Sequence, residues 1–184
     1  YDKNKDLKSL FKLVLFTPED LNIIKDGPNF RRDLIDDIII SVNFSYKAVK
    51  KDFDKILSQR NKLLKNQRSK YFKTELMAFD QQIIRLNYKI YRFREKYISL
   101  INTYANKNHL NLTENKENLT IIYKPNIKAN SMEEYGEKFS KNISDDLKYF
   151  RTTSGSQRDE IDIIINGKDT KKFGSQGQQR SAIL

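Results

Sequence analysis

Apolar residues recur at alternating steps of four and three over two stretches in the middle of the chain, residues 42–63 and 72–104. A polar segment, Asn-Gln-Arg-Ser-Lys at residues 66–70, separates them. This heptad-like spacing predicts two long helices with one apolar seam each, buried against each other in an antiparallel hairpin. The predicted seam consists of Val42, Tyr46, Val49, Phe53, Ile56, Arg60, Leu63, Phe72, Leu76, Phe79, Ile83, Leu86, Ile90, Phe93, Tyr97, Leu100 and Tyr104.

The N-terminal part predicts a strand followed by two helix starts. The apolar run at residues 13–16 suits a buried strand. The sequence Thr-Pro-Glu-Asp at residues 17–20 then begins a helix, with a capping threonine, proline at the first position and two acids facing the positive end. A Gly-Pro pair ends it and permits another helix. In that helix Arg31 and Arg32 either contact phosphates or form a local ion pair with Asp36.

The second half of the chain predicts strands and one helix. Residues 106–118 are polar and predict a loop, and residues 119–123 predict a strand. Residues 132–149 predict a helix that contains one glycine. Residues 161–165 predict a strand that turns at an Asn-Gly pair and returns over residues 170–173.

Composition and charge narrow the class of partner. A net charge of +11 suggests a polyanion, and 38% apolar residues suit an elongated helical body. The abundance of Lys, Asn and Ile is also a pattern that genome composition produces, so charge alone leaves nucleic acid open. His109, the single histidine, lies in a polar stretch and is expected at the surface. The chain has no cysteine for disulfides or zinc, and no apolar run near the ~18 residues of a membrane span.

Cations gather on the outward faces of the predicted hairpin. Near the tip they include Lys62, Lys65, Arg68 and Lys70. On the return helix they are Arg85, Lys89, Arg92, Arg94 and Lys96. These faces are either simply solvated or form a track along DNA phosphates, which would ignore sequence and weaken with salt. The aromatic residues of the seam are interpreted as core packing rather than as a surface for base stacking.

Small residues gather near the C-terminal end, where residues 173–180 read Phe-Gly-Ser-Gln-Gly-Gln-Gln-Arg. Residues 181–184 read as the first turn of a helix. Small residues let the backbone approach a bound group, and the free N–H groups at a helix start favour an anion. Ser175 would add a hydroxyl donor, and Gln178 and Arg180 would reach phosphate oxygens. The alternative is a flexible tail.

The stretch at 173–180 resembles the signature motif of ABC-type ATPases, in the form found in the RecF family of SMC-like DNA repair ATPases. Three further matches occur in the family's order. They are residues 15–21 (Leu-Phe-Thr-Pro-Glu-Asp-Leu), 59–65 (Gln-Arg-Asn-Lys-Leu-Leu-Lys) and 152–159 (Thr-Thr-Ser-Gly-Ser-Gln-Arg-Asp). The resemblance therefore spans nearly the whole chain.

The chain departs from the family at two places. Ser156 and Gln157 stand where the family usually has Pro-His, so any chemistry of that histidine is not available here. Phe30 and Asp33 replace a glutamate and the third of three arginines, which puts a triple-arginine patch in doubt. Arg158 and Asp159 match the family and are expected to order the turn by pairing with each other or with neighbours.

The resemblance implies a mostly helical α+β fold, in which an antiparallel helical-hairpin arm is attached to part of an ABC-type ATPase head. Residues 1–28 would be a piece of the head, and residues 29–112 the arm. Residues 113–184 would be strands and a helix that return to the head and end in the signature.

In enzymes of this kind the ATP-binding loop of one subunit meets the signature of another. The resemblance implies that Ser175, Gly177 and Gln178 contact the nucleotide in trans, with ATP and Mg²⁺ as cofactors of an ATP-dependent homodimer. It also favours DNA as the ligand of the cations singled out above, for which the candidate residues are Arg31, Arg32, Lys62, Lys65, Arg68 and Lys70. The intact protein would be a cytoplasmic, nucleoid-associated DNA-dependent ATPase at gapped or junction DNA, helping to load recombinase with RecR and RecO and making no membrane contact.

The chain has no Gly-x-x-x-x-Gly-Lys-Ser/Thr loop. We therefore expect a fragment that does not hydrolyse ATP alone, with no catalytic residue and no metal site of its own. Two alternatives remain at this point. One is a non-enzymatic basic helical module that binds DNA or a partner protein, and the other is the arm of a different SMC-like protein.

Overall fold

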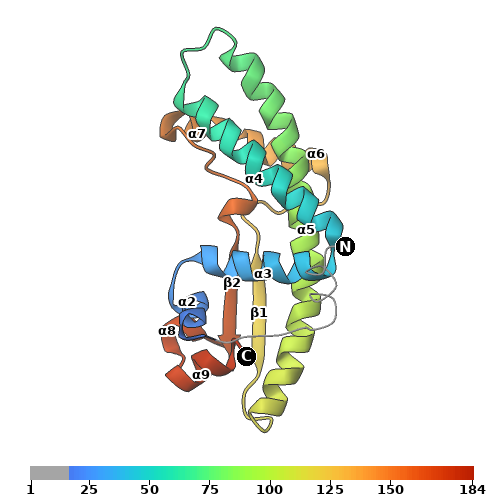
Figure 1. Ribbon diagram of the computed structural model, residues 1–184, viewed down its shortest axis with the longest axis vertical. Helices are drawn as coiled ribbons and strands as arrows, with labels where there is room; N and C mark the ends of the chain where they lie inside the picture. The colour runs from blue at the N-terminus through green and yellow to red at the C-terminus, as the bar shows by residue number, and fades with distance from the viewer. Residues whose placement is uncertain (1–16) are drawn as a thin grey trace, which may run out of the picture.

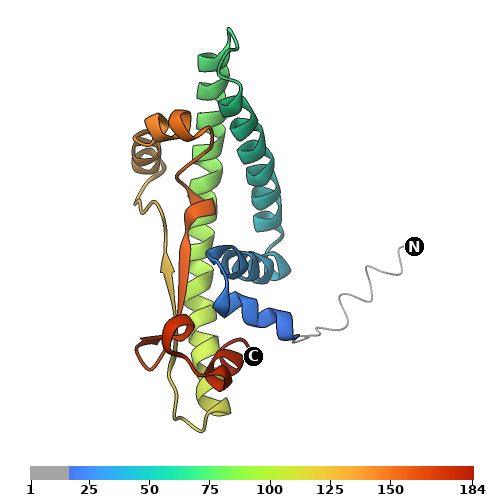
Figure 2. The same ribbon diagram turned by 90° about the vertical axis from the view of Figure 1, so that its left-hand side faces the viewer.

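The computed structural model describes residues 17–184. The strand predicted at residues 13–16 lies outside the described residues. In chain order the elements are η1 (Pro18–Leu21), α2 (Asn22–Lys25), α3 (Pro28–Val42), α4 (Phe44–Lys65), α5 (Phe72–Leu112), β1 (Leu119–Lys124), α6 (Met132–Ser140), α7 (Ile143–Tyr149), η2 (Ser156–Arg158), β2 (Glu160–Ile165), β3 (Lys168–Asp169), α8 (Thr170–Phe173) and α9 (Gln176–Ser181). Helix α5 runs almost the full length of the molecule, and the other elements lie along it (Figures 1 and 2).

Helices α4 and α5 form the predicted antiparallel hairpin, which is joined by residues 66–71, called the tip loop below (Figure 1). The buried seam residues in the two helices are Tyr46, Phe53, Arg60, Leu64, Leu76, Ile83 and Ile90. Near the tip the seam is shifted by one residue, because Leu64 is buried where Leu63 was predicted. The periodic pattern thus predicted the hairpin and most of its contact face.

The pairing of α4 with α5 begins at Asn43. The side-chain oxygen of Asn43 accepts a hydrogen bond from the N–H of Tyr46 at 3.0 Å and so caps α4. Its amide nitrogen donates to the hydroxyl of Tyr97 on α5 at 3.0 Å. Because α4 reaches no further along α5, Leu100 and Tyr104 of the predicted seam are exposed. Val42 is also exposed, because it ends α3 before α4 begins.

Beyond this point β1 replaces α4 as the neighbour of α5. The side-chain oxygen of Asn102 accepts from the N–H of Ile121 at 2.6 Å, and that of Asn106 accepts from the N–H of Leu119 at 3.1 Å. The other side of β1 pairs antiparallel with β2, and β2 with β3. The helix thus satisfies backbone donors on the edge of β1 that no strand within residues 17–184 covers.

The prediction of a C-terminal hairpin is confirmed for the turn but is wrong for the returning strand. Asn166 and Gly167 have φ angles of 49° and 76°, as a two-residue hairpin turn requires. Strand β3 has only two residues, and residues 170–173 form the helix α8 rather than a returning strand. The carboxylate of Asp169 causes this, because it accepts hydrogen bonds from the N–H groups two and three residues further on, at 2.8 and 3.2 Å.

Two other predicted boundaries are wrong. Helix α5 continues through residues 106–112, where a loop was predicted. Residues 132–149 form two helices, and the break lies at residues 141–142 rather than at Gly136. Gly136 lies within α6 beside Ile84 of α5, where an added Cβ would make an ordinary contact at 3.4 Å.

A single buried cluster joins the helical hairpin to the sheet. Its members are Ile35, Ile39, Tyr46, Phe53, Ile83, Ile90, Tyr91, Ile98, Ile127, Ala129, Tyr135, Phe139 and Ile161. Helix α3 contributes to it by crossing over the sheet toward α5 (Figure 1). None of the helices described is long and apolar enough to cross a membrane.

Candidate functional site

The signature stretch, residues 173–180, places Ser175 at the start of α9. The Ser175 hydroxyl accepts from the N–H of Gln178 at 3.2 Å, and the Gln178 side-chain oxygen accepts from the N–H of Ser175 at 3.0 Å. This reciprocal cap starts the helix at Gln176. The prediction that a helix begins at residues 181–184 is wrong, because those residues come at and after its end.

Ser175 and Gly177 are exposed at this helix start, and Gln178 is half-buried. A hydroxyl has one donor and two acceptor sites, so the Ser175 O–H keeps its donor while it caps the helix. Both polar atoms of the Gln178 amide are already bonded, one to Ser175 and the other to Glu117. The exposed groups that an anion would meet are therefore the Ser175 hydroxyl and the first-turn backbone.

A polar chain fixes α9 to the far end of α5. Gln178 donates to the carboxylate of Glu117 at 2.9 Å, whose other oxygen lies 3.2 Å from Nε2 of His109. The Nδ1 atom of His109 lies 3.3 Å from the carbonyl of Ser181. His109 is only 2% exposed, so the prediction of a surface histidine is wrong. Its partners lie 8 to 72 residues away in sequence, which a local pattern does not reveal.

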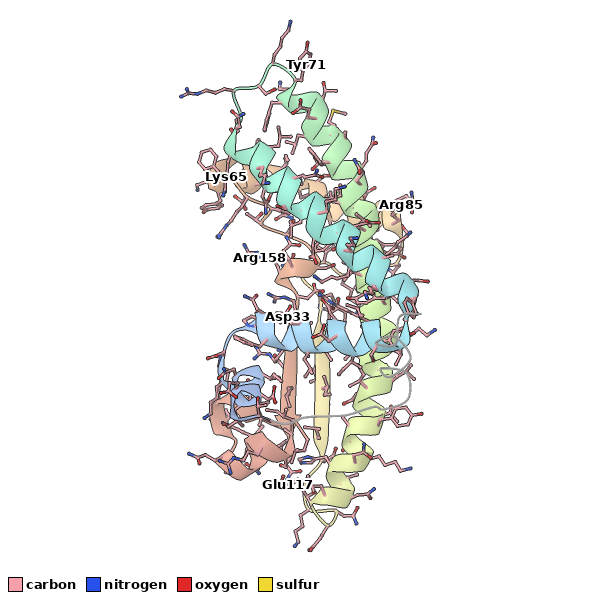
Figure 3. All side chains as sticks on the ribbon, viewed as in Figure 1. Asp33, Lys65, Tyr71, Arg85, Glu117 and Arg158 are labelled. Atoms are coloured by element: carbon pink, nitrogen blue, oxygen red, sulfur yellow. The ribbon has the colours of Figure 1, made fainter. Side chains whose placement is uncertain are left out.

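The four predicted tip cations are all exposed: Lys62, Lys65, Arg68 and Lys70. Within the described residues none of them forms an ion pair. Lys65 and Tyr71 lie at the tip and Glu117 at the opposite end of the molecule, with Arg85 on the helix between them (Figure 3). Since α5 has 41 residues, the tip cations and the signature stretch are separated by about 60 Å along this helix.

Arg31 and Arg32 are placed differently from the tip cations. The guanidinium of Arg31 is buried and donates to the carbonyls of Ile23 and Asp26 at 3.1 and 3.2 Å. Arg32 is half-buried and donates to the carbonyl of Asp159 at 2.7 Å. Burial, and then the charge of Arg94, lower the pKa of Arg32. These bonds hold the turn before α3 and the start of β2 in place.

The partner of Asp36 is Arg94, so the local ion pair predicted for Asp36 is wrong. Arg94 donates to both carboxylate oxygens of Asp36, at 2.9 and 2.8 Å, and to Asp159 at 2.8 Å. Arg94 is 2% exposed, although the sequence placed it on the basic face. Burial alone would lower its pKa, but the hydrogen bonds and charge of Asp36, with Asp159, raise the pKa well above its usual value.

A second buried arginine joins two of the matched segments. Arg60 donates to Asp80 and Asp146, and to the hydroxyl of Thr152, each at 2.7 Å. The neighbouring Asn61 accepts from the N–H of Thr152 at 2.7 Å. The segments 59–65 and 152–159, which the sequence matched separately, therefore contact each other. An arginine at a seam position was the only hint of this in the sequence.

The turn at residues 152–159 fits closely against α5. Gly155 has a φ of 115°, and a Cβ there would lie 2.9 Å from the side chain of Asn87. Asn87 accepts from the N–H of Ser156 at 2.8 Å. Arg158 is exposed and Asp159 is buried beside Arg94, so Asp159 orders the turn through neighbours, and the two residues form no ion pair with each other. No cluster of metal-ligating side chains occurs in residues 17–184.

Comparison with known protein sequences gives relatives that all carry the same name. The chain is 39% identical over 176 residues to the DNA replication and repair protein RecF of Thermoanaerobacter sp. (strain X514), covering 93% of the chain and 49% of that protein. It is 35% identical over 189 residues to the RecF of Alkaliphilus oremlandii (strain OhILAs), covering 99% of the chain and 51% of that protein. No protein-family model matches.

Solved structures agree. The recombination mediator protein RecF-ATP in the RecFOR pathway superposes with a TM-score of 0.84 at 31% identity, covering 95% of this chain and 48% of that one. The corresponding RecF-ATPrS structure gives a TM-score of 0.86. The chain thus spans about half the length of the relatives it matches.

Proposed function

Over nearly its whole length the chain is homologous to RecF, and on this premise we propose a function for the intact protein of which it forms about half. That protein is an ATP-dependent DNA-binding repair protein that acts at gapped or junction DNA and helps to load recombinase. This chain supplies its helical arm and its signature stretch. RecR, RecO and a second copy of the protein are the proposed partners.

The nucleotide part of the proposal is carried by Ser175. Its hydroxyl and the N–H groups near Gly177 contact the γ-phosphate of an ATP that the ATP-binding loop of another subunit holds with Mg²⁺. The exposed helix start supports this, because the first-turn N–H groups that the Ser175 cap leaves free favour an anion. Gln178 acts indirectly, by positioning Ser175, since its amide is hydrogen-bonded to Ser175 and Glu117. Energy from the shared nucleotide then stabilises the dimer.

Ser175→Arg in the intact protein tests this assignment. A bulky cation at the exposed helix start is expected to abolish ATP-driven dimerisation, measured as molar mass by light scattering. Binding of nucleotide to the monomer should stay nearly unchanged, because the ATP-binding loop belongs to the other half of the site. Ser140→Arg, at an exposed serine that ends α6, is the matched control. Normal dimerisation of the Ser175 variant would contradict the assignment.

The DNA part of the proposal is carried by the tip cations. Lys62, Lys65, Arg68 and Lys70 contact backbone phosphates, which binds DNA without regard to sequence. Their exposure and their lack of ion pairs among the described residues support this. Arg31 has no part in it, because its guanidinium is buried against backbone carbonyls. Arg32 contributes little to DNA binding, because it is half-buried and already donates to the carbonyl of Asp159.

A salt series tests the DNA track. The slope of log affinity against log salt is negative, and each phosphate contact adds about 0.9 to its magnitude. Replacing the four tip cations by glutamine should therefore lower the slope by about 3 to 4 in fluorescence anisotropy with duplex DNA. Four exposed lysines at the other end serve as the control set: Lys25, Lys107, Lys116 and Lys168. An unchanged slope in the tip variant would place the DNA contacts elsewhere.

The two alternatives lose support. A basic helical module with an incidental glycine-rich tail leaves the capped and tethered α9 unexplained, since Gln178 is fixed to Glu117. The arm of another SMC-like protein is disfavoured by 35–39% identity to RecF proteins along the chain.

A further inference from the structure

An exposed phenylalanine at the end of α7 has an unusual backbone. Phe150 has a φ of 55° and a ψ of 32°, in the left-handed region that helix ends normally give to glycine or asparagine. Its side chain is 50% exposed, so burial does not explain why a bulky residue stands there. Tyr149 beside it is 52% exposed. The chain therefore keeps an aromatic ring on the surface at a strained position.

Hydrogen bonds fix this segment on both sides. Gln67 of the tip loop donates to the carbonyl of Leu147 at 2.8 Å. After the phenylalanine, the N–H of Arg151 donates to the carbonyl of Asp146 at 3.2 Å. The N–H of Thr152 then bonds to Asn61 at 2.7 Å. The ring of Phe150 is thus presented from a fixed backbone, beside the root of the tip loop.

The ring forms one wall of an open cleft of about 600 Å³. The other walls are Lys65, Asn66, Gln67 and Arg68. Residues 62–73 contain five cations and no acid, and residues 148–151 contain two cations and no acid. The cleft, called the tip cleft below, thus combines an aromatic face with positive charge from two separate segments. The absence of acids from both segments makes it a poor site for a cation and a good one for a polyanion.

We propose that the tip cleft binds single-stranded DNA, with an unpaired base stacked on the ring of Phe150 and the flanking phosphates beside Lys65 and Arg68. A ring face and neighbouring cations are the combination by which proteins hold single strands without reading their sequence. A duplex offers the cations its phosphates, but its stacked bases cannot reach the ring. The proposal rests on DNA being the ligand of the arm, and adds that the arm distinguishes single from double strands.

Phe150→Gly in the intact protein gives a sharp test. Glycine removes the ring and suits the left-handed backbone, so the fold is expected to be kept. Affinity for a short oligothymidylate, measured by fluorescence anisotropy, should fall about tenfold, since stacking contributes substantially per base. Affinity for a blunt duplex should change by less than about twofold, and the salt slope should not change because no phosphate contact is lost. Phe44→Ala, at an 89% exposed phenylalanine in the first turn of α4, is the control.

The outcomes separate this proposal from the one on which it rests. If the wild-type protein binds neither DNA, the proposed DNA track fails. If it binds both and Phe150→Gly binds both as well as the wild type, only the stacking site fails. Equal loss of single- and double-strand binding would also overturn it, because the ring would then act on the backbone of any DNA. Phe150→Trp adds a direct readout: its fluorescence should be quenched by oligothymidylate and not by duplex.

Discussion

Replacing Arg94 by methionine is expected to destabilise the protein more than any change of an exposed arginine. The side chain makes three hydrogen bonds to the carboxylates of Asp36 and Asp159 and a fourth, at 2.7 Å, to the carbonyl of Ser156. Methionine fills a similar volume but leaves both carboxylates without their main countercharge. Lys50 is no substitute, since its ammonium lies 4.0 Å from Asp36 and is shared with Asp54.

The magnitude follows from the number of groups left unpaired. Removing one partner of a buried ion pair costs about 3–5 kcal/mol. Here two carboxylates lose the same partner, so the free energy of unfolding is expected to fall by about 5 kcal/mol. Arg94→Lys keeps the charge but not the bidentate geometry of the guanidinium, and should lower the free energy of unfolding by roughly 1–3 kcal/mol. With a urea dependence of about 1–3 kcal/mol per molar, the methionine variant should shift the unfolding midpoint by about 2 M or more.

Urea unfolding followed by circular dichroism measures these losses. Arg92→Met is the matched control, because Arg92 is exposed and, within the part of the chain that the structure describes, pairs only with Glu95 three residues away, a contact whose loss costs about 0.5 kcal/mol. If Arg94→Met shifts the midpoint no more than Arg92→Met does, the buried network contributes nothing to stability and the reasoning fails. A changed urea dependence would show instead that the variant alters the compactness of one of the two states.

Two further predictions concern the turn against α5 and the tether of α9. Gly155→Ala should lower the free energy of unfolding by roughly 2–3 kcal/mol through backbone strain and displacement of Asn87. Gly167→Ala, at a φ of 76° in open space, should lower it by only about 1 kcal/mol. Equal losses in thermal unfolding would contradict the role of crowding at Gly155. Glu117→Ala should speed hydrogen exchange of the Gln179 N–H about fivefold, because α9 loses its tether. Glu114→Ala, at an exposed glutamate that pairs with the nearby Lys116, should leave that rate unchanged. Identical rates in both variants would show that the tether does not hold the helix.

The local patterns predicted the hairpin, the strands β1 and β2 and the turn between β2 and β3, because each depends on neighbours in sequence. Spacing identified the seam of α4 and α5 where the two helices actually meet. It failed at Leu100 and Tyr104, since nothing local says where α4 stops covering α5. The helix α8 was missed because the strand interpretation ignored Asp169 as a cap.

The polar core lay beyond local reasoning. Arg94 binds carboxylates 58 residues before it and 65 residues after it, and a charged residue on a polar-looking helix face gives no sign of such partners. Arg60 was visible as a charge in an apolar seam, yet its partners follow 20 and 86 residues later. The small residues and helix start at residues 173–180 suggested an anion site, but the same composition also suits a flexible tail, and only the resemblance favoured the first interpretation.

The uninterrupted length of α5 has a mechanical consequence. One end of this helix lies at the tip loop, and its other end is fixed to α9 through His109 and Glu117. A rigid rod of about 60 Å turns a tilt of about 5° at its base into a displacement of about 5 Å at its tip. In the proposed dimer, a small tilt at the signature end would thus move the tip cleft by about 5 Å, which makes the helix a lever between the two ends of the molecule.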